Sequence, residues 1–231
     1  MFYQMEDLPC INYPIQPLLV NIALQIRKGC NLYYKLLRTS KDQKNLLAER
    51  ENRWHIELGV TYSVKFWNAA YFYTSCIKND NKLKWQQYQI VRNSQYTNYK
   101  VNKFNPSISP LCAYCLEENE TISHLYFRCK NIYPLWQDII RFVAGVGVTI
   151  PMNESAILFG IHSEKPDSRA NILVLWGKNY IWYNKFINTH ITLDTFKIKL
   201  KQNLIELREV FTFGETESEF SKWDSLLNMV L

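Results

Sequence analysis

The sequence predicts a mainly α-helical protein, a bundle-like assembly of helices organised around one short cysteine-rich segment. Three observations support this fold class. Nearly every segment places its apolar residues at helical spacing, and strand-like alternation is weak throughout. The chain has only 7 glycines and 8 prolines among 231 residues, which argues against a turn-rich all-β fold. Three of its six cysteines fall within 18 residues of one another, together with a histidine.

Helices are expected along the first half of the chain wherever apolar residues recur on one face. The expected ranges are 17–28, 30–38, 42–57, 61–78 and 82–94. The polar run 39–42 supplies an N-cap for the third of these helices, and Gly59 ends it. Pro106 and Pro110 then bracket a stretch that we expect to be non-helical.

The second half continues the helical pattern. The expected ranges are 121–129, 131–143, a short helix through 155–160, 167–187, 193–211 and 216–230. Asn153 is placed to cap the short helix, and Gly145 and Gly147 end the helix before it. The segment 145–150 (GVGVTI) is the one place where local strand pairing is an alternative.

The cysteine-rich segment has the spacing of a metal site. Cys112, Cys115, His124 and Cys129 follow the pattern C-x2-C-x8-H-x4-C. A C-x2-C turn brings two sulfurs to one point, and H-x4-C on a short helix places the imidazole and the third sulfur about one turn apart. Zn²⁺ binds four such ligands as a tetrahedron, and a site filled by protein is structural. We therefore predict a helical assembly around a small knuckle that holds one structural Zn²⁺.

The alternative is three buried cysteines and a satisfied histidine that lie close together by chance. The other cysteines, Cys10, Cys30 and Cys76, are scattered, and we expect them to be small buried hydrophobes rather than disulfide partners. This usage indicates a reducing compartment, either cytoplasm or nucleus. No uncharged apolar run reaches 18 residues and no secretory signal pattern opens the chain, so no membrane partner is expected.

A basic and aromatic segment leads into the knuckle. Residues 78–104 contain six lysines or arginines against one acidic residue, Asp80. Cations neutralise phosphates, and aromatic faces stack on unpaired bases. The candidate nucleic-acid-binding residues are Lys82, Lys84, Arg92, Tyr96, Tyr99, Lys100 and Lys103. A solvated basic face with its aromatic residues turned into the core remains an alternative, because Trp85 and Tyr88 also fit helical packing.

No pattern of catalytic residues is present. The seven aspartates are far apart in sequence, so they offer no adjacent pair for two-metal phosphoryl transfer. No Walker loop, G-x-S-x-G elbow or H-E-x-x-H motif occurs. A cysteine nucleophile beside a histidine in space stays open. We nevertheless expect that the chain is not an enzyme.

Residues 92–136 resemble the zinc-binding C-terminal region of non-LTR (LINE-type) retrotransposon reverse transcriptases. The features that carry the resemblance are the Tyr-Thr at 96–97 after basic residues, the C-x2-C, Glu120-Thr121-x-x-His124-Leu125, Cys129 and Leu135-Trp136. Weaker matches follow the same order at 28–37, 54–59, 157–160 and 171–182, so the resemblance spans roughly 20–200.

The resemblance implies a non-catalytic, zinc-binding module that helps to hold template RNA or target DNA beside a reverse transcriptase core. It implies that Cys112, Cys115, His124 and Cys129 are the zinc ligands. The paired aspartates of the polymerase are absent from this chain. A helical protein-interaction scaffold, stapled by zinc and left from a retroelement, is the second hypothesis. We divide the chain into an N-terminal helical segment (1–59), the basic helices with the zinc module (60–150) and a C-terminal helical segment (151–231).

Overall fold

The computed structural model describes residues 41–76, 80–162, 168–187, 191–214 and 217–230, without the side chains at 41–48, 50, 74–76 and 210–220. The chain divides into two compact units, Met1–Glu49 and Arg50–Leu231. The first lies almost wholly outside the described residues, as do the helices expected at 17–28 and 30–38. The side chains of Cys10, Cys30 and Cys76 are also outside them. The segment boundaries expected at 59/60 and 150/151 stay predictions.

The described residues form ten helices and no strand, which confirms the mainly α-helical fold class. The helices are α3 Lys41–Leu58, α4 Val64–Cys76, α5 Asn81–Val91, α6 Asn98–Asn102, the π-helix η1 His124–Arg128, α7 Tyr133–Ala144, α8 Glu154–Phe159, α9 Ser168–Ile187, α10 Leu193–Gly214 and α11 Glu217–Val230. Every helix expected after residue 41 has a counterpart among the described residues, with its ends shifted by a few residues, and the one expected at 121–129 is mostly the π-helix η1.

Two local differences from the expectations have physical reasons. Helix α6 was not expected. It is a single turn with no buried residue, and its sequence therefore lacks the apolar stripe from which a helix is predicted. The segment 145–150 is not a strand: Val148 and Ile150 turn toward the core, but the segment has no pairing partner among the described residues. The alternating apolar residues of this segment belong to an extended connection between α7 and α8 that covers the core.

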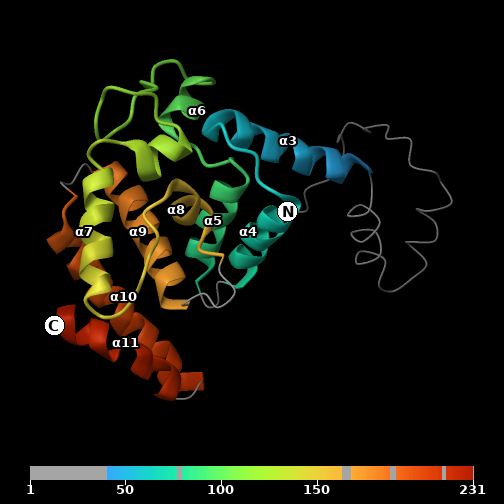
Figure 1. Cartoon of the computed structure of the whole chain (residues 1–231). Helices are drawn as coiled ribbons and strands as arrows, with labels where there is room; N and C mark the ends of the chain where they lie inside the picture. The colour runs from blue at the N-terminus through green and yellow to red at the C-terminus, as the bar shows by residue number, and fades with distance from the viewer. Residues whose placement is uncertain (1–40, 77–79, 163–167, 188–190, 215–216, 231) are drawn as a thin grey trace, which may run out of the picture. The chain divides into compact units, whose positions relative to one another are not determined.

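Helix α9 is central to the second unit. It runs between α7 and α10 on one side and α5 and α8 on the other (Figure 1), and it contacts α5 and α10. Ten of its residues between Ala170 and Ile181 are buried, which agrees with a helix that is apolar on most of its circumference. A Cβ on Gly177 would come within 2.5 Å of Trp136 Cη2, so the missing side chain lets the indole of α7 pack directly on α9.

A cluster of aromatic rings fixes the ends of α3, α4 and α8. Phe159 lies at its centre, with its ring centroid 5.0 Å from that of Trp54 and 5.2 Å from that of Trp67. Trp54 is fully buried and donates its indole N–H to the carbonyl oxygen of Val91 at 2.9 Å. This bond satisfies a backbone acceptor at the end of α5 and ties α3 to that helix.

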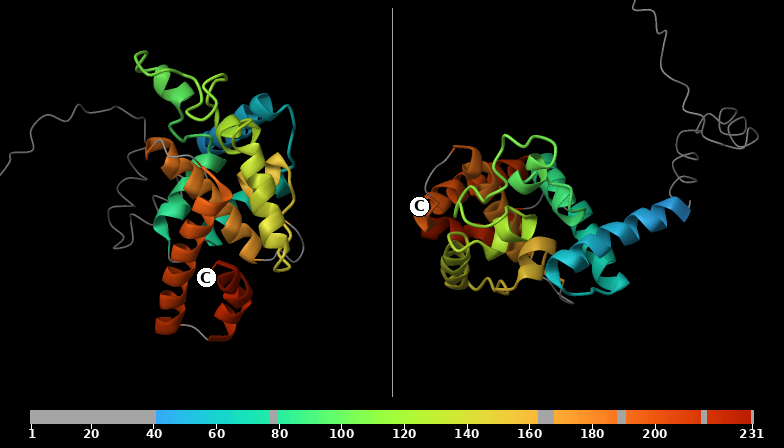
Figure 2. Two further views of the ribbon diagram at one scale, coloured as in Figure 1. Left: turned by 90° about the vertical axis from the view of Figure 1, so that its left-hand side faces the viewer. Right: turned by 90° about the horizontal axis from the view of Figure 1, so that it is seen from above.

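The C-terminal helices α10 and α11 form an antiparallel hairpin, seen in the left panel of Figure 2. Trp223 of α11 packs on Trp176 of α9, with ring centroids 5.5 Å apart. Within the described residues, no helix is both long enough and apolar enough to cross a bilayer.

Candidate metal centre and adjoining basic surface

The two N-terminal cysteines lie on a tight turn. An isolated antiparallel bridge joins Leu111 to Asn119, and Cys112 N donates to Glu118 O at 2.8 Å. Leu116 has a φ of +59°, a left-handed conformation that reverses the chain after Cys115. The amide of Tyr114 donates to Cys112 Sγ at 3.4 Å. The turn therefore holds both sulfurs on one side and offers one of them a backbone donor.

The histidine and the last cysteine are brought together by a π-helix. Cys129 N donates to His124 O at 2.9 Å, the i to i+5 bond that defines this conformation. In a regular α-helix a residue five positions on lies about 140° around the axis. The wider π turn reduces this angle, so that His124 and Cys129 lie on the same side of the helix. The regular helix expected over 121–129 is therefore wrong in detail, and the difference is what makes an H-x4-C spacing fit.

The four predicted ligand atoms converge. One nitrogen of His124 and the three sulfurs all lie within 4.8 Å of one another. Cys112 Sγ is 3.8 Å from Cys129 Sγ, and Cys115 Sγ is 3.3 Å from His124 Nε2. Cys112 and Cys129 are fully buried and His124 is nearly so. A closed set of three sulfurs and one imidazole nitrogen suits one structural Zn²⁺.

The protonation chemistry of these cysteines points to a cation. The contact with Cys129, followed by burial, raises the pKa of the Cys112 thiol, whereas the hydrogen bond from Cys112 lowers the pKa of Cys129. Two neighbouring sulfurs thus share one proton when no positive charge lies between them. A divalent ion replaces that proton and lets all the sulfurs ionise together, which is the chemistry of a zinc–thiolate site.

Residues 30–136 match the model of a protein family described as zinc-binding in reverse transcriptase. The match covers all four converging ligands and the basic segment that precedes them. It agrees with the geometry in assigning zinc to this part of the chain. No curated protein shows significant similarity to the chain.

An acidic residue lies behind the histidine of this candidate zinc site. Glu118 Oε2 is 3.4 Å from His124 Nδ1, the ring nitrogen that faces away from the sulfurs. Their geometry falls short of a hydrogen bond, and Nδ1 has no hydrogen-bond partner. Both residues line an open hollow of about 490 Å³ together with Glu57 and Arg128.

A second glutamate, Glu120, joins the knuckle to two helices. It is fully buried and accepts hydrogen bonds from Asn98 N at 2.8 Å and Ala113 N at 3.0 Å. It also forms an ion pair with the ammonium of Lys185 near the end of α9. Ala113 lies between the first two ligands and Asn98 begins α6. One carboxylate therefore fixes the zinc turn, the start of α6 and the end of α9 relative to one another.

Trp136 packs behind the knuckle, as its position seven residues after Cys129 predicts. Its indole N–H donates to Tyr126 O at 2.6 Å, within the π-helix, and the residue is fully buried. Tyr126 in turn receives a hydrogen bond from Gln86 Nε2 and donates to Gln95 Oε1, both at 3.0 Å. The knuckle thus rests on a polar network that reaches α5.

The predicted nucleic-acid-binding residues fall into two adjoining groups. Lys82, Lys84 and Arg92 lie on or just after α5, whereas Tyr96, Tyr99, Lys100 and Lys103 surround α6. Lys82 and Lys84 are exposed. Lys103 Nζ lies 4.6 Å from the centroid of the Tyr99 ring, and the exposed Tyr96 packs edge-on against Phe104.

Lys100 differs from the other lysines because its ammonium has protein partners. Nζ donates to Asn93 O and Asn93 Oδ1, each at 2.6 Å, and Asn93 Nδ2 donates to Glu57 Oε2 at 2.9 Å. Burial lowers the pKa of Lys100 to about 8, with smaller effects from Glu57, Arg53 and Lys103. The contact folds α6 back onto the end of α5, so Lys100 joins the two groups. Its predicted contact with phosphate stays a prediction.

Three residues of this region, Arg53, Glu120 and Lys185, were not among the predicted site residues. Arg53 belongs to α3 but is close enough to affect the pKa of Lys100, so it adds a cation to the surface around α6. Glu120 and Lys185 are 65 positions apart, and only the folded chain pairs them. Glu120 was named within the Glu-Thr-x-x-His run that carries the resemblance, but without a role, and no local pattern identifies Lys185 as its partner.

Proposed function

We propose that this chain is a non-catalytic nucleic-acid-binding module, similar to the zinc-binding region of LINE-type reverse transcriptases, that holds RNA or single-stranded DNA. The observation that carries the proposal is the attachment of the basic surface to the zinc turn through Glu120. Its carboxylate accepts from Ala113 N inside the turn and from Asn98 N at the start of α6. We therefore expect zinc binding to order the segment that presents Lys103 and Tyr99.

The charge and the composition of this surface support a polyanionic partner. Lys82, Lys84 and Lys103 are exposed, and none has an ion-pair partner among the residues that the structure describes. Phosphate binding by such side chains releases counterions and gives an affinity that falls steeply with salt. A reverse transcriptase core is the protein partner that the family match suggests for such a module, in the cytoplasm or the nucleus.

A binding series tests the proposal directly. Fluorescence anisotropy would compare single-stranded RNA, single-stranded DNA and duplex DNA between about 50 and 200 mM salt, with and without a zinc chelator. We expect binding to a single strand that weakens with salt and is lost on zinc removal. A Lys103→Glu variant should bind more weakly and lower the salt slope by about one. Lys222→Glu, the same charge change on α11, is the control.

Two results would count against the proposal. The absence of binding at low salt would favour the alternative of a helical protein-interaction scaffold, which the exposed aromatic end of α9 around Tyr183 and Phe186 would suit. Nucleotide incorporation in a primer-extension assay would contradict the non-catalytic assignment.

A further inference from the structure

Three flat side chains form a continuous stack on one face of α5. Trp85, Tyr88 and Arg92 are spaced i, i+3 and i+7, so they follow the same side of the helix. The rings of Trp85 and Tyr88 have centroids 5.6 Å apart and planes inclined by only 20°. The guanidinium carbon of Arg92 lies 4.2 Å from the centroid of the Tyr88 ring. Trp85 and Arg92 therefore both pack against the ring of Tyr88.

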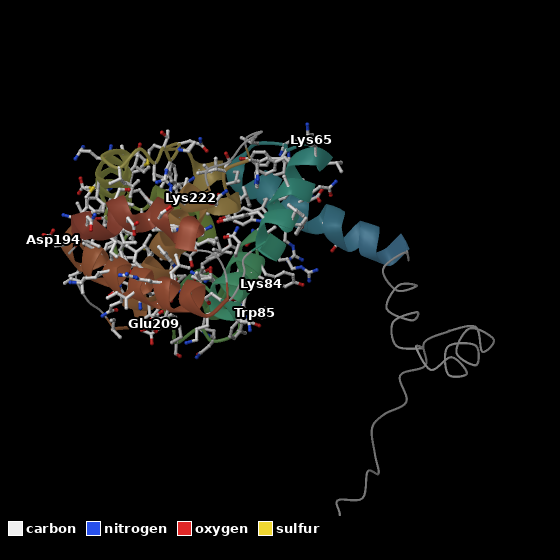
Figure 3. All side chains as sticks on the ribbon, turned by 90° about the horizontal axis from the view of Figure 1, so that it is seen from below. Lys65, Lys84, Trp85, Asp194, Glu209 and Lys222 are labelled. Atoms are coloured by element: carbon white, nitrogen blue, oxygen red, sulfur yellow. The ribbon has the colours of Figure 1, made fainter. Side chains whose placement is uncertain are left out.

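Core packing does not account for the first member of this stack. Helix α5 buries its opposite side, including Leu83 and Ile90, whereas Trp85 is 60% exposed. Figure 3 shows Trp85 beside Lys84 at the edge of the described side chains. Tyr88 supports the indole from one side, and the exposed part remains open to a ligand. A rigid, supported aromatic plane is what a base-stacking contact requires.

The surroundings of the stack are positively charged. Lys82 and Lys84 flank Trp85 on the helix, and both are exposed. Arg92 Nε is buried and has no hydrogen-bond partner. The one acidic residue of the segment 78–104, Asp80, accepts hydrogen bonds from the amides of Lys82 and Leu83 at the start of α5. Its carboxylate is thus directed at the helix N-terminus.

We propose that the stack of Trp85, Tyr88 and Arg92 binds an unpaired base of a single-stranded nucleic acid, with Lys82 and Lys84 on the adjoining phosphates. The proposal rests on the function proposed above and narrows it to single strands, because duplex bases have their faces covered by neighbouring bases. A cationic protein segment would be repelled by the three positive side chains. An acidic peptide would pair with the lysines but would leave the indole face without a flat partner.

The test uses the zinc-loaded full chain and two labelled strands of about 12 nucleotides, oligo(dT) and an abasic strand with the same backbone. We expect Trp85→Ala to weaken binding to oligo(dT) by about tenfold and to leave binding to the abasic strand unchanged. Trp85→Phe, which keeps a flat ring, should retain most of the affinity. Tyr183→Ala, which removes a similarly exposed ring (68%) from α9, is the control.

The outcomes separate the two proposals. Equal losses on oligo(dT) and on the abasic strand would overturn base stacking, as would an unchanged affinity of Trp85→Ala for oligo(dT). Either result leaves the proposed function intact, provided that the unmodified chain binds oligo(dT). If the unmodified chain binds neither strand nor a single-stranded RNA of the same length at low salt, the proposed function itself fails. An unchanged salt slope in Trp85→Ala, together with lower affinity, would support a non-ionic contact by the indole.

Discussion

The carboxylate of Glu120 and the ammonium of Lys185 form an ion pair that solvent hardly reaches, with side-chain exposures of 0% and 5%. The pair joins the zinc turn to the end of α9. Two backbone amides complete the coordination of the carboxylate, so the buried charge has three donors rather than one. Charges removed from water are tolerated when they are paired in this way.

Replacement of Lys185 by methionine should destabilise the protein, because it leaves a buried carboxylate without its counter-charge. The expected loss in free energy of unfolding is roughly 3–5 kcal/mol. The double variant Glu120→Gln/Lys185→Met should recover part of that loss, since the uncompensated charge is gone. Chemical denaturation of Glu120→Gln, Lys185→Met and the double variant measures the effect. A fully additive double variant would show that the two side chains do not interact.

Metal analysis should find about one zinc per chain, and removal of that zinc should lower the melting temperature. Three sulfurs and one imidazole nitrogen within 4.8 Å need a cation to ionise together, and zinc binding supplies folding free energy. Thermal unfolding followed by circular dichroism, before and after chelation, measures the change. Re-addition of Zn²⁺ should restore the original curve, whereas Mg²⁺ should not. A zinc-free preparation with the same melting temperature would contradict a structural metal.

Glu118→Gln should weaken zinc binding by about tenfold, because a carboxylate behind a metal-bound imidazole orients the ring and strengthens it as a ligand. Glu118 Oε2 lies 3.4 Å from His124 Nδ1, close enough for a small movement to form that contact. Competition with a chromophoric chelator measures the affinity. Glu117→Gln is the matched control, since Glu117 pairs with Lys130 instead. Equal zinc affinities in the two variants would exclude this role for Glu118.

The buried Lys178 should make stability rise with pH above neutrality. Its Nζ donates to Gln87 Oε1 at 2.5 Å and Leu158 O at 3.2 Å, and burial lowers its pKa from 10.5 to about 7. Between these values the unfolded chain holds a proton that the folded chain lacks. Lys178 therefore makes the free energy of unfolding increase as pH rises through this window, and its contribution is flat below about pH 7.

Lys178→Met removes this dependence. The free energy of unfolding of the unmodified protein, relative to that of the variant, should increase from pH 7 to pH 9. Urea denaturation at both pH values measures the difference. Lys84→Met, which replaces an exposed lysine, should show no such change. A difference that stays constant, or moves in the other direction, would contradict a neutral Lys178.

Gly177→Ala should destabilise the contact between α7 and α9 by about 1–3 kcal/mol. The added Cβ would lie 2.5 Å from Trp136 Cη2, and the indole is held in place by full burial and by its hydrogen bond to Tyr126 O. Thermal unfolding measures the loss. In a Trp136→Phe background the smaller ring should accept the methyl group, so the same substitution should have a smaller effect there. An equal effect in both backgrounds would show that the clash is relieved elsewhere.

Much of the helical architecture and the ligand set were predictable from local patterns. Periodic apolar residues place the helices from residue 41 onward, Asn153 caps α8 through Ala156 N at 2.8 Å, and Trp136 lies against the knuckle. These features depend on neighbours within about ten positions along the chain, so the sequence encodes them directly. The short α6 was not predictable in this way, because it buries no residue and has no apolar stripe. A helix was expected over 121–129, but its π conformation was not, because the apolar pattern does not distinguish a π turn from an α turn.

The sequence by itself identified the four zinc ligands, because cysteines and a histidine in the order C-x2-C-x8-H-x4-C form a metal-binding pattern. In the structure their ligand atoms lie within 4.8 Å of one another. The tertiary structure decided how the basic residues are used. In the folded chain Lys100 is hydrogen-bonded to Asn93, and Glu120 forms an ion pair with Lys185. Trp85 stays exposed and stacks on Tyr88. These outcomes depend on which side of each helix meets the core and on contacts between distant segments, and neither can be read from a helix's own periodicity.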